Sequence, residues 1–471
     1  MRSRRHAIAI SALAVTLIAA PLTACGTDSD GESASSSTVS TTPLNPFEQQ
    51  RYDGVTALLD QLSATLSSGD RAGLAELIDD AAPAEFRRRM EAIAADFAGP
   101  DEPIKGSGPL KLKEFRYRVA PQNGPEHLLD ETFVAQLEDA GASDTWVSPV
   151  YLNYALGGAS SPGLDEPTVT LNESLTFARY GDDWKVVGEG GLAPDPTPET
   201  VLQSNPKAPE MGPWEFPGLA ATDVSTSGGT STVLFYRGSQ KAATTASRIL
   251  PASVNDVTKF WGEDWVRKAA VISTATDEQF AGLTRTEPGT TSAAAAATVF
   301  AMVDKQNKQV IGQRIVLTPA ARSLPAASLA VVLRHELVHV AARLVTAENV
   351  PLWLTEGVPE YVGRKGTYRE FVDAAPELAA AVAAGDVPKA LPSDGSFSVT
   401  SDDARLAYQS AWSFAAFVAD AGGEGKLKDM YVNVAKGGDT ATTEAAIKDA
   451  LGVDKAKVVS DWQAWLTKQA R

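Results

Sequence analysis

The stretch LPAASLAVVLRHELVHVAARLV, residues 324–345, decides how this 471-residue chain is interpreted. Its apolar residues recur on nearly every face of a helix, which is typical of a helix that is buried on all sides. Pro325, near the start, suits the first turn of a helix because its missing N–H is not needed there. The stretch therefore predicts a buried helix, and every polar side chain within it needs a partner.

The segment HELVH within this helix carries such polar side chains. His335 and His339 are four residues apart, so they lie on one face about one turn apart and can reach a single metal ion. Glu336 leans toward the same side, where it could take a proton from a metal-bound water. The alternative is two buried histidines held only by hydrogen bonds. Because the chain has four histidines in all, a chance match to this pattern is rare.

A catalytic zinc ion usually takes three protein ligands and keeps a fourth position for water, so a third ligand is needed. The stretch PLWLTEGVPEYVG, residues 351–363, supplies a candidate, because a helix after a short loop would bring Glu356 back toward the two histidines. Glu360, four residues later, would lie on the same face. A carboxylate with apolar neighbours needs a cation. The apolar neighbours of Glu356 are Trp353, Leu354, Val358 and Tyr361.

HELVH followed by WLTEGVPEY resembles the gluzincin branch of the zinc metallopeptidases, and within it the peptidase MA-like proteins. Those proteins carry HExxH and then a helix of the type WLxEGxAEY. The resemblance covers residues 230 to 470, since the helical tail also looks like that family. It implies one Zn²⁺ per chain, with Glu336 as the general base that activates a zinc-bound water. The zinc ligands that it implies are His335, His339 and Glu356.

The resemblance also implies roles for two residues outside the ligand set. Glu360 would accept a hydrogen bond from the far ring nitrogen of His335 and so fix its tautomer. Gluzincins often use a Tyr or His donor to bind the oxyanion, and Tyr408 is the candidate because no histidine follows His339. Packing in a helical core beside Trp412 would explain Tyr408 equally well.

The sequence departs from members of that family in one place, and it lacks a stretch found in one branch of the family. Pro359 stands where those proteins usually have Ala, so the helix either begins near Glu356 or is kinked beside it. The kinked alternative leaves open a metal site that is formed but poorly active. The aminopeptidase branch also has a GxMEN stretch that binds the free amine, and this sequence has none. We therefore expect an endopeptidase.

The first part of the chain, residues 45–190, has another pattern. Apolar residues repeat every three to four positions up to Gly99, which predicts three helices. The period then changes to two, which predicts antiparallel strands, with a phase slip at Glu114 typical of a β-bulge and a hairpin at GDD. The closing FARYGDDWKVVGEGG resembles the last hairpin of nuclear transport factor 2-like domains. Many members of that fold only bind, so we assign this domain no chemistry.

A Pro-rich stretch, residues 191–219, is interpreted as a linker to a second domain, residues 220–471. Strands are expected in STVLFYRGS, RKAAVIST and GQRIVLTP, with a helix around ASVNDVTKFWG, and nearly everything after HELVH is expected to be helical. The expected fold class is α+β: a nuclear transport factor 2-like domain, then a zincin-like metallopeptidase domain whose C-terminal part is mainly helical.

The N-terminus has the plan of a bacterial export signal over residues 1–24, with a basic start and an apolar run too short to span a bilayer. Its end, LTAC, resembles the lipobox of bacterial lipoproteins, in which the cysteine carries a diacylglycerol. Cys25 is the only cysteine, so no disulfide competes for it. With a Ser/Thr-rich tether over residues 25–44, we expect a lipid-anchored protein on the extracytoplasmic face of the cell membrane.

Charge disfavours one class of partner. The formal net charge is −17, and loss of the three arginines in residues 1–24, which contain no acid, would make it −20. Such a surface repels phosphate backbones, so we expect no nucleic-acid partner.

His127, in NGPEHLL, is interpreted as a solvent-exposed histidine rather than a metal ligand. The sequence leaves the oligomeric state open.

Three functional hypotheses follow. The first is a lipid-anchored zinc metallopeptidase that cleaves peptides or proteins outside the cytoplasmic membrane. The second is a binding or scaffold lipoprotein whose peptidase-like domain keeps a zinc ion only for structure. The third adds regulation, with the first domain covering the cleft of the second.

Overall fold

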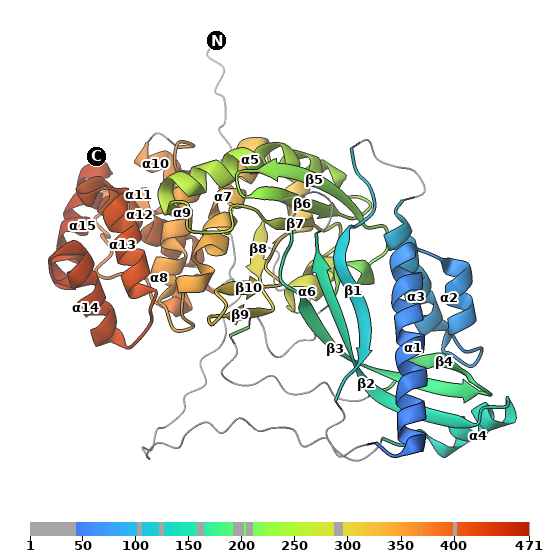
Figure 1. Ribbon diagram of the computed structural model, residues 1–471. Helices are drawn as coiled ribbons and strands as arrows, with labels where there is room; N and C mark the ends of the chain where they lie inside the picture. Colours follow the sequence, from blue (N-terminus) through green and yellow to red (C-terminus); the bar gives the residue numbers. More distant parts are fainter. Residues whose placement is uncertain are drawn as a thin grey trace, which may run out of the picture.

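The computed structural model describes residues 44–100, 106–121, 127–157, 164–191, 202–203, 211–286, 295–368, 370–398 and 403–470. The expected signal peptide, Cys25 and the tether up to residue 43 lie outside the described residues, as does most of the expected linker. Figure 1 shows the N-terminal sheet and helices at one end and the C-terminal helices at the other, with a second sheet and α7 between them. Within the described ranges, no helix is both long enough and apolar enough to cross a bilayer.

The chain begins with the three helices expected from its apolar period. They are α1 (Pro46–Ser68), α2 (Arg71–Leu77) and α3 (Ala84–Ala98). At the start of α1, the Asn45 side chain accepts from the Glu48 N–H while the Glu48 carboxylate accepts from the Asn45 N–H, a reciprocal capping box. The helix is capped by Gly69, whose φ of 71° lies in the left-handed region that favours glycine.

The first sheet is a four-stranded antiparallel meander in the order β1-β2-β3-β4. Its strands are β1 (Leu112–Val119), β2 (Asp144–Leu156), β3 (Val169–Tyr180) and β4 (Asp183–Glu189), and α4 (Glu131–Asp139) precedes β2. The register of β1 shifts between Leu112 and Glu114, which confirms the expected bulge. Tyr180 pairs with Asp183 across a two-residue turn, which confirms the hairpin at GDD. The likeness to nuclear transport factor 2 stays a prediction.

The second sheet has five strands in the order β5-β6-β7-β11-β8. They are β5 (Ala220–Thr226), β6 (Gly229–Phe235), β7 (Ala270–Ser273), β11 (Arg314–Leu317) and β8 (Ala296–Val299). The three central strands are parallel, and β5 and β8 are antiparallel edges. The sequence predicts the central three and misses both edges. The connecting elements are η1 (Pro213–Glu215), α5 (Gln240–Trp261), α6 (Asp277–Thr284), β9 (Met302–Asp304) and β10 (Gln309–Ile311).

The central strands of this sheet are apolar on both faces. Val271 of β7 and Ile315 of β11 face the core that contains α5 and α7. Their neighbours Ile272 and Val316 belong to the other core, which includes α1, α3 and the first sheet. Because side chains alternate along a strand, these uninterrupted apolar runs require a covering layer on each face. The N-terminal domain supplies one of those layers.

The described end of the expected linker is packed into that shared core. Trp214 is fully buried, and its ring lies 5.7 Å from Phe97, 5.2 Å from Phe115 and 4.7 Å from Tyr154, between ring centroids. A buried ion pair between Arg314 of β11 and Glu166, in the segment between β2 and β3, also joins the second sheet to the N-terminal domain. The first sheet, the second sheet and the described end of the expected linker thus share one continuous core.

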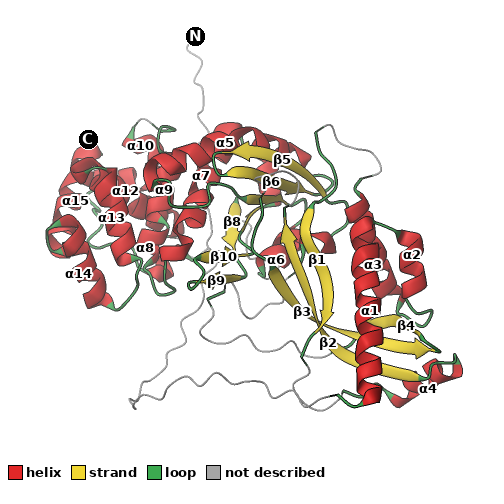
Figure 2. Ribbon diagram, viewed as in Figure 1, coloured by secondary structure: helices red, strands yellow, loops and turns green. Residues whose placement is uncertain are grey.

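The rest of the chain is helical, as expected, and Figure 2 shows no strand among the elements that follow α7 in the described residues. The buried helix expected over residues 324–345 is α7 (Ala326–Ala342), preceded by η2 (Pro319–Ser323) and continued by the turn η3 (Arg343–Val345). The elements after it are α8 (Leu352–Thr355), α9 (Gly357–Arg364), α10 (Phe371–Ala374), α11 (Pro376–Ala383), η4 (Asp394–Phe397), α12 (Ala404–Gly422), α13 (Glu424–Val434), α14 (Thr440–Leu451) and α15 (Lys455–Gln469).

Candidate metal centre

Three side chains implied as zinc ligands lie together in the interior. The Nε2 atoms of His335 and His339 are 3.1 Å apart. The Glu356 carboxylate places one oxygen 3.4 Å from the Nε2 of His335 and the other 3.9 Å from the Nε2 of His339. One donor atom from each residue lies within 4.8 Å of the others, and all three side chains are buried. The two histidines come from one turn of α7, as their spacing predicts.

The break between α8 and α9 positions Glu356. The residue ends α8 and directly precedes α9, its N–H donating to the Leu352 carbonyl and its carbonyl accepting from the Glu360 N–H. Pro359 is the third residue of α9, in the first turn, where no intrahelical partner exists for a backbone N–H. The first of the two alternatives for this proline, a helix that begins near Glu356, is therefore confirmed.

Two glycines allow α9 to approach its neighbours closely. A Cβ on Gly363 would lie 2.8 Å from the Val331 carbonyl oxygen of α7. A Cβ on Gly357 would lie 2.6 Å from the Ala411 carbonyl oxygen of α12. Contacts below 3 Å to backbone are not tolerated, so only glycine permits this packing. The close approach holds the Glu356 carboxylate against the histidines of α7.

Glu360 lies behind His335, as expected from the resemblance. One of its oxygens is 3.4 Å from the Nδ1 of His335, and the other accepts from Arg364, whose guanidinium also donates to the Ala374 carbonyl. Burial works against the ionised carboxylate, but the Arg364 and His335 charges overcome it and lower the pKa of Glu360 to about 2. For His335, burial disfavours the cation, but hydrogen bonds to Glu356 and Glu360 raise its pKa to about 10. Glu360 is thus an anion beside the Nδ1 of His335, and its role in fixing the tautomer of that ring stays a prediction.

Glu336 lies beside this group and is 1% exposed. Its Oε2 accepts a 2.6 Å hydrogen bond from Thr298 of β8, and its Oε1 is buried without a hydrogen-bond partner in the described part of the chain. Burial raises the pKa of Glu336 to about 7, although the His335 charge and the Thr298 hydrogen bond act in the opposite direction. A carboxyl group with this pKa can both take up and release a proton near neutral pH.

Tyr408 of α12 faces the same three carboxylates. Burial, and then the charges of Glu356, Glu360 and Glu336, raise its pKa well above the usual value of a tyrosine. The hydroxyl is therefore protonated, and it makes no hydrogen bond within the described ranges. The ring packs edge-on against Phe397, with centroids 5.1 Å apart. Tyr408 thus packs in the core close enough to the three carboxylates for their charges to act on it, and its role as an oxyanion donor stays a prediction.

The arrangement fits a zinc ion. Two imidazole nitrogens and a carboxylate converge from two directions, which is a common ligand set for catalytic zinc. Glu336, Glu356 and Glu360 are all buried here, and a group of buried negative charges needs cationic partners. The unpaired Oε1 of Glu336, next to the three donors, also fits a site that takes a further polar ligand.

Two supporting residues were not identified from the sequence. Thr298 follows an alanine run on a short edge strand, and no local pattern links it to Glu336. Arg364 could have been found, because it stands four residues after Glu360 on the same helix face, the spacing of a helical ion pair.

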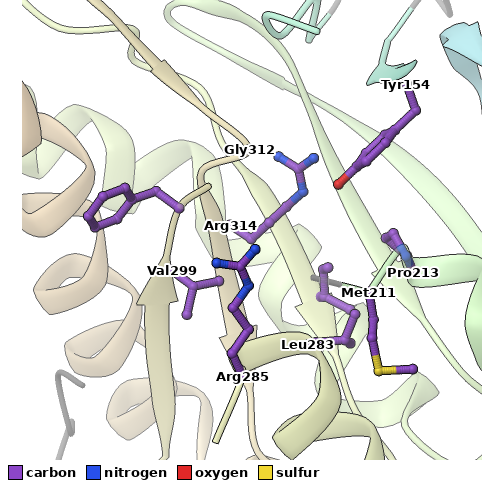
Figure 3. Close-up of a pocket in the computed structure, with 10 residues that line it drawn as sticks. Tyr154, Met211, Pro213, Leu283, Arg285, Val299, Gly312 and Arg314 are labelled. Atoms are coloured by element: carbon purple, nitrogen blue, oxygen red, sulfur yellow. The ribbon is translucent and has the colours of Figure 1, made fainter. Parts of the chain in front are cut away.

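Neither His127 nor the cavity between the two sheets belongs to the candidate metal centre. His127 is exposed, as expected, and is not among the grouped donors. Figure 3 shows a cavity at the joint between the two sheets, lined among others by Tyr154, Arg285 and Arg314. Its volume of about 30 Å³ is enough for roughly one water molecule. None of the three grouped donors lines it.

Comparison with known proteins concerns mainly the helical part. Residues 315–468, from β11 to α15, match the family described as the Peptidase MA superfamily, and this range contains the whole grouped set of donors. A search among curated proteins finds no match.

Some solved structures are similar to the chain. Native yeast LTA4 hydrolase is 12% identical, with a TM-score of 0.33, over 69% of this chain and 60% of that one. An M1 zinc metallopeptidase from Deinococcus radiodurans is 13% identical, with a TM-score of 0.29, over 70% of this chain and 62% of that one. The chain thus spans less than two thirds of the length of either structure.

Proposed function

We propose that this protein is a zinc metallopeptidase of the gluzincin type. The observation that carries the proposal is the convergence of His335, His339 and Glu356 within 4.8 Å in the interior, with the Glu336 carboxyl beside them. The family match over residues 315–468 supports a zinc peptidase-like protein. The substrates would be peptides or proteins.

The residues around the site divide the work between them. A bound zinc ion supplies a Lewis acid that polarises the scissile carbonyl and makes water more acidic. Glu336 takes the proton of the attacking water at its free Oε1, while Thr298 holds the other oxygen, and later passes the proton to the leaving amine. The protonated Tyr408 hydroxyl donates to the oxyanion. Glu360, fixed by Arg364, keeps the His335 ring in place.

The location and the type of cleavage rest on the sequence. The signal-like residues 1–24 and the lipobox-like LTAC support lipidation of Cys25 and an extracytoplasmic position on the cell membrane. The lack of a GxMEN stretch supports cleavage of internal peptide bonds rather than removal of N-terminal residues. A lipoprotein with a purely structural zinc is the competing proposal.

The decisive experiment compares Glu336→Gln with the wild type. The amide has the size of the carboxylate and can still accept from Thr298, so the variant should fold and bind one zinc ion per chain. Loss of the general base should lower the rate of casein hydrolysis by about 10²–10⁴-fold. Glu348→Gln, at an exposed position, is the control and should keep full activity.

Metal content and hydrolysis together separate the two proposals. Bound zinc with no turnover in the wild type, and loss of stability in chelator, would favour the structural role. Full activity in Glu336→Gln would remove the mechanism described above.

A further inference from the structure

Arg343 stands at the edge of the candidate metal centre. It follows α7 with helical backbone angles, four residues after His339 and eight after His335, so it extends the same helix face by one more turn. Its charge is close enough to disfavour protonation of His339 and to interact with Glu356 and Tyr431. It is neither one of the grouped metal donors nor a candidate for proton transfer.

The guanidinium of Arg343 is held in place but is not paired. Its Cζ lies 4.5 Å from the centre of the Phe300 ring, which directly follows the edge strand β8. Stacking of this kind fixes the plane of the group and leaves its N–H donors available. The Nε is buried without a hydrogen-bond partner, and within the described ranges no carboxylate forms an ion pair with the side chain.

Three other buried or half-buried arginines of the described chain have carboxylate partners. The pairs are Arg89 with Glu215, Arg314 with Glu166, and Arg364 with Glu360. At Arg343, burial lowers the pKa despite the opposing charges of Tyr431 and Glu356, which means that the neighbours do not offset the cost of desolvation. A partly buried cation that the protein does not neutralise invites an anion from outside.

Metal binding would increase the excess of positive charge around Arg343. Glu356, the carboxylate whose charge acts on Arg343, would be a ligand, and a divalent ion with one glutamate and two neutral histidines carries a net charge of +1. Arg343 would add one further positive charge beside the reacting centre. Resting on the proposed function, we propose that Arg343 is a specificity residue that binds a carboxylate of the peptide substrate next to the scissile bond. The carboxylate comes either from an acidic side chain or from the C-terminus of the peptide.

The first test compares cleavage specificity in Arg343→Met and the wild type. Both digest a mixed peptide library made in two forms, with free and with amidated C-termini, and mass spectrometry identifies the cleaved bonds. Enrichment of Asp or Glu at a fixed position in both forms indicates a side-chain carboxylate. Cleavage at a fixed distance from the end in the free form alone indicates the C-terminus. In Arg343→Met, the preference for the carboxylate should be at least tenfold weaker than in the wild type. Arg322→Met, which removes an exposed charge, should keep it.

The second test measures binding without turnover. In a Glu336→Gln background, calorimetry gives the Kd of the preferred library peptide and of its uncharged twin, with Gln for Glu or an amide for the terminal acid. The charged peptide should bind at least tenfold more tightly, and Arg343→Met should abolish the difference. Arg343→Lys, which keeps the charge but not the bidentate fork, should retain part of it.

The outcomes separate this inference from the proposed function. Hydrolysis by the wild type without any preference for a carboxylate would overturn the role of Arg343 and leave the peptidase intact. A preference that persists in Arg343→Met would overturn it as well. Absence of zinc and of hydrolysis in the wild type would remove the proposed function first. Metal content and a thermal melt of each variant show whether it is folded. If Arg343→Met is not folded, the Kd values of Arg343→Lys test the role of Arg343 instead.

Discussion

Substitution of Gly357 by alanine should disturb the metal centre without touching any proposed ligand. Gly357 follows Glu356 at the start of α9, where an added Cβ would lie 2.6 Å from the Ala411 carbonyl oxygen and 2.8 Å from its carbonyl carbon. Ordinary contacts begin at 3.4 Å. Since the obstacle is the backbone of α12 rather than a flexible side chain, α9 must move away by about 0.8 Å, the difference between 3.4 and 2.6 Å.

The magnitude follows from two opposing terms. Overpacking of this kind costs about 1–3 kcal/mol, and the helix preference of alanine over glycine returns at most about 1 kcal/mol. The net loss in the free energy of unfolding should be about 1–2 kcal/mol. Because Glu356 moves with α9, its distance from the histidines changes by several tenths of an ångström, and the affinity for zinc should fall by about tenfold or more.

Two measurements on Gly357→Ala separate these effects. Urea unfolding in chelator gives the stability of the metal-free protein, and zinc competition with a chromophoric chelator gives the affinity. Gly425→Ala is the matched control, since Gly425 is also helical and a Cβ there meets nothing within 4 Å. The control should be as stable as the wild type or more stable, with unchanged zinc affinity. If Gly357→Ala behaves like the control, then close packing of α9 on α12 does not position Glu356.

Two further outcomes are expected. Glu360→Gln weakens the hold of Arg364 and removes the carboxylate charge 3.4 Å from the Nδ1 of His335, so zinc affinity in chelator competition should fall by about 10–100-fold, while Glu348→Gln keeps the wild-type value. Burial raises the pKa of Asp96 to about 6, against backbone hydrogen bonds that lower it, so the wild type loses stability as pH rises from about 4 to about 6. Asp96→Asn should therefore gain stability relative to the wild type by up to about 3 kcal/mol between pH 4 and pH 7.5 in urea unfolding, and a pH-independent difference would contradict the assignment.

Periodicity in the sequence was sufficient for the local parts of this structure. The spacing of His335 and His339 places both rings on one helix face because an α-helix repeats every 3.6 residues, whatever surrounds it. Pro359 restricts where α9 can begin for an equally local reason, its missing N–H and fixed φ. The bulge at Glu114 and the hairpin at GDD were likewise predictable from the sequence, since side chains alternate along every strand.

Only the tertiary structure decided which residues meet. Thr298 hydrogen-bonds Glu336 because an edge strand lies against α7, and Arg343 remains unpaired because no described acid reaches it. The apolar runs of the central strands predict that both faces of the second sheet are covered, but they do not show which elements cover them. In the structure, the N-terminal domain covers one of these faces. Such pairings join segments that are tens or hundreds of residues apart. They depend on how whole elements pack together, whereas helical and strand periods depend only on neighbours along the chain.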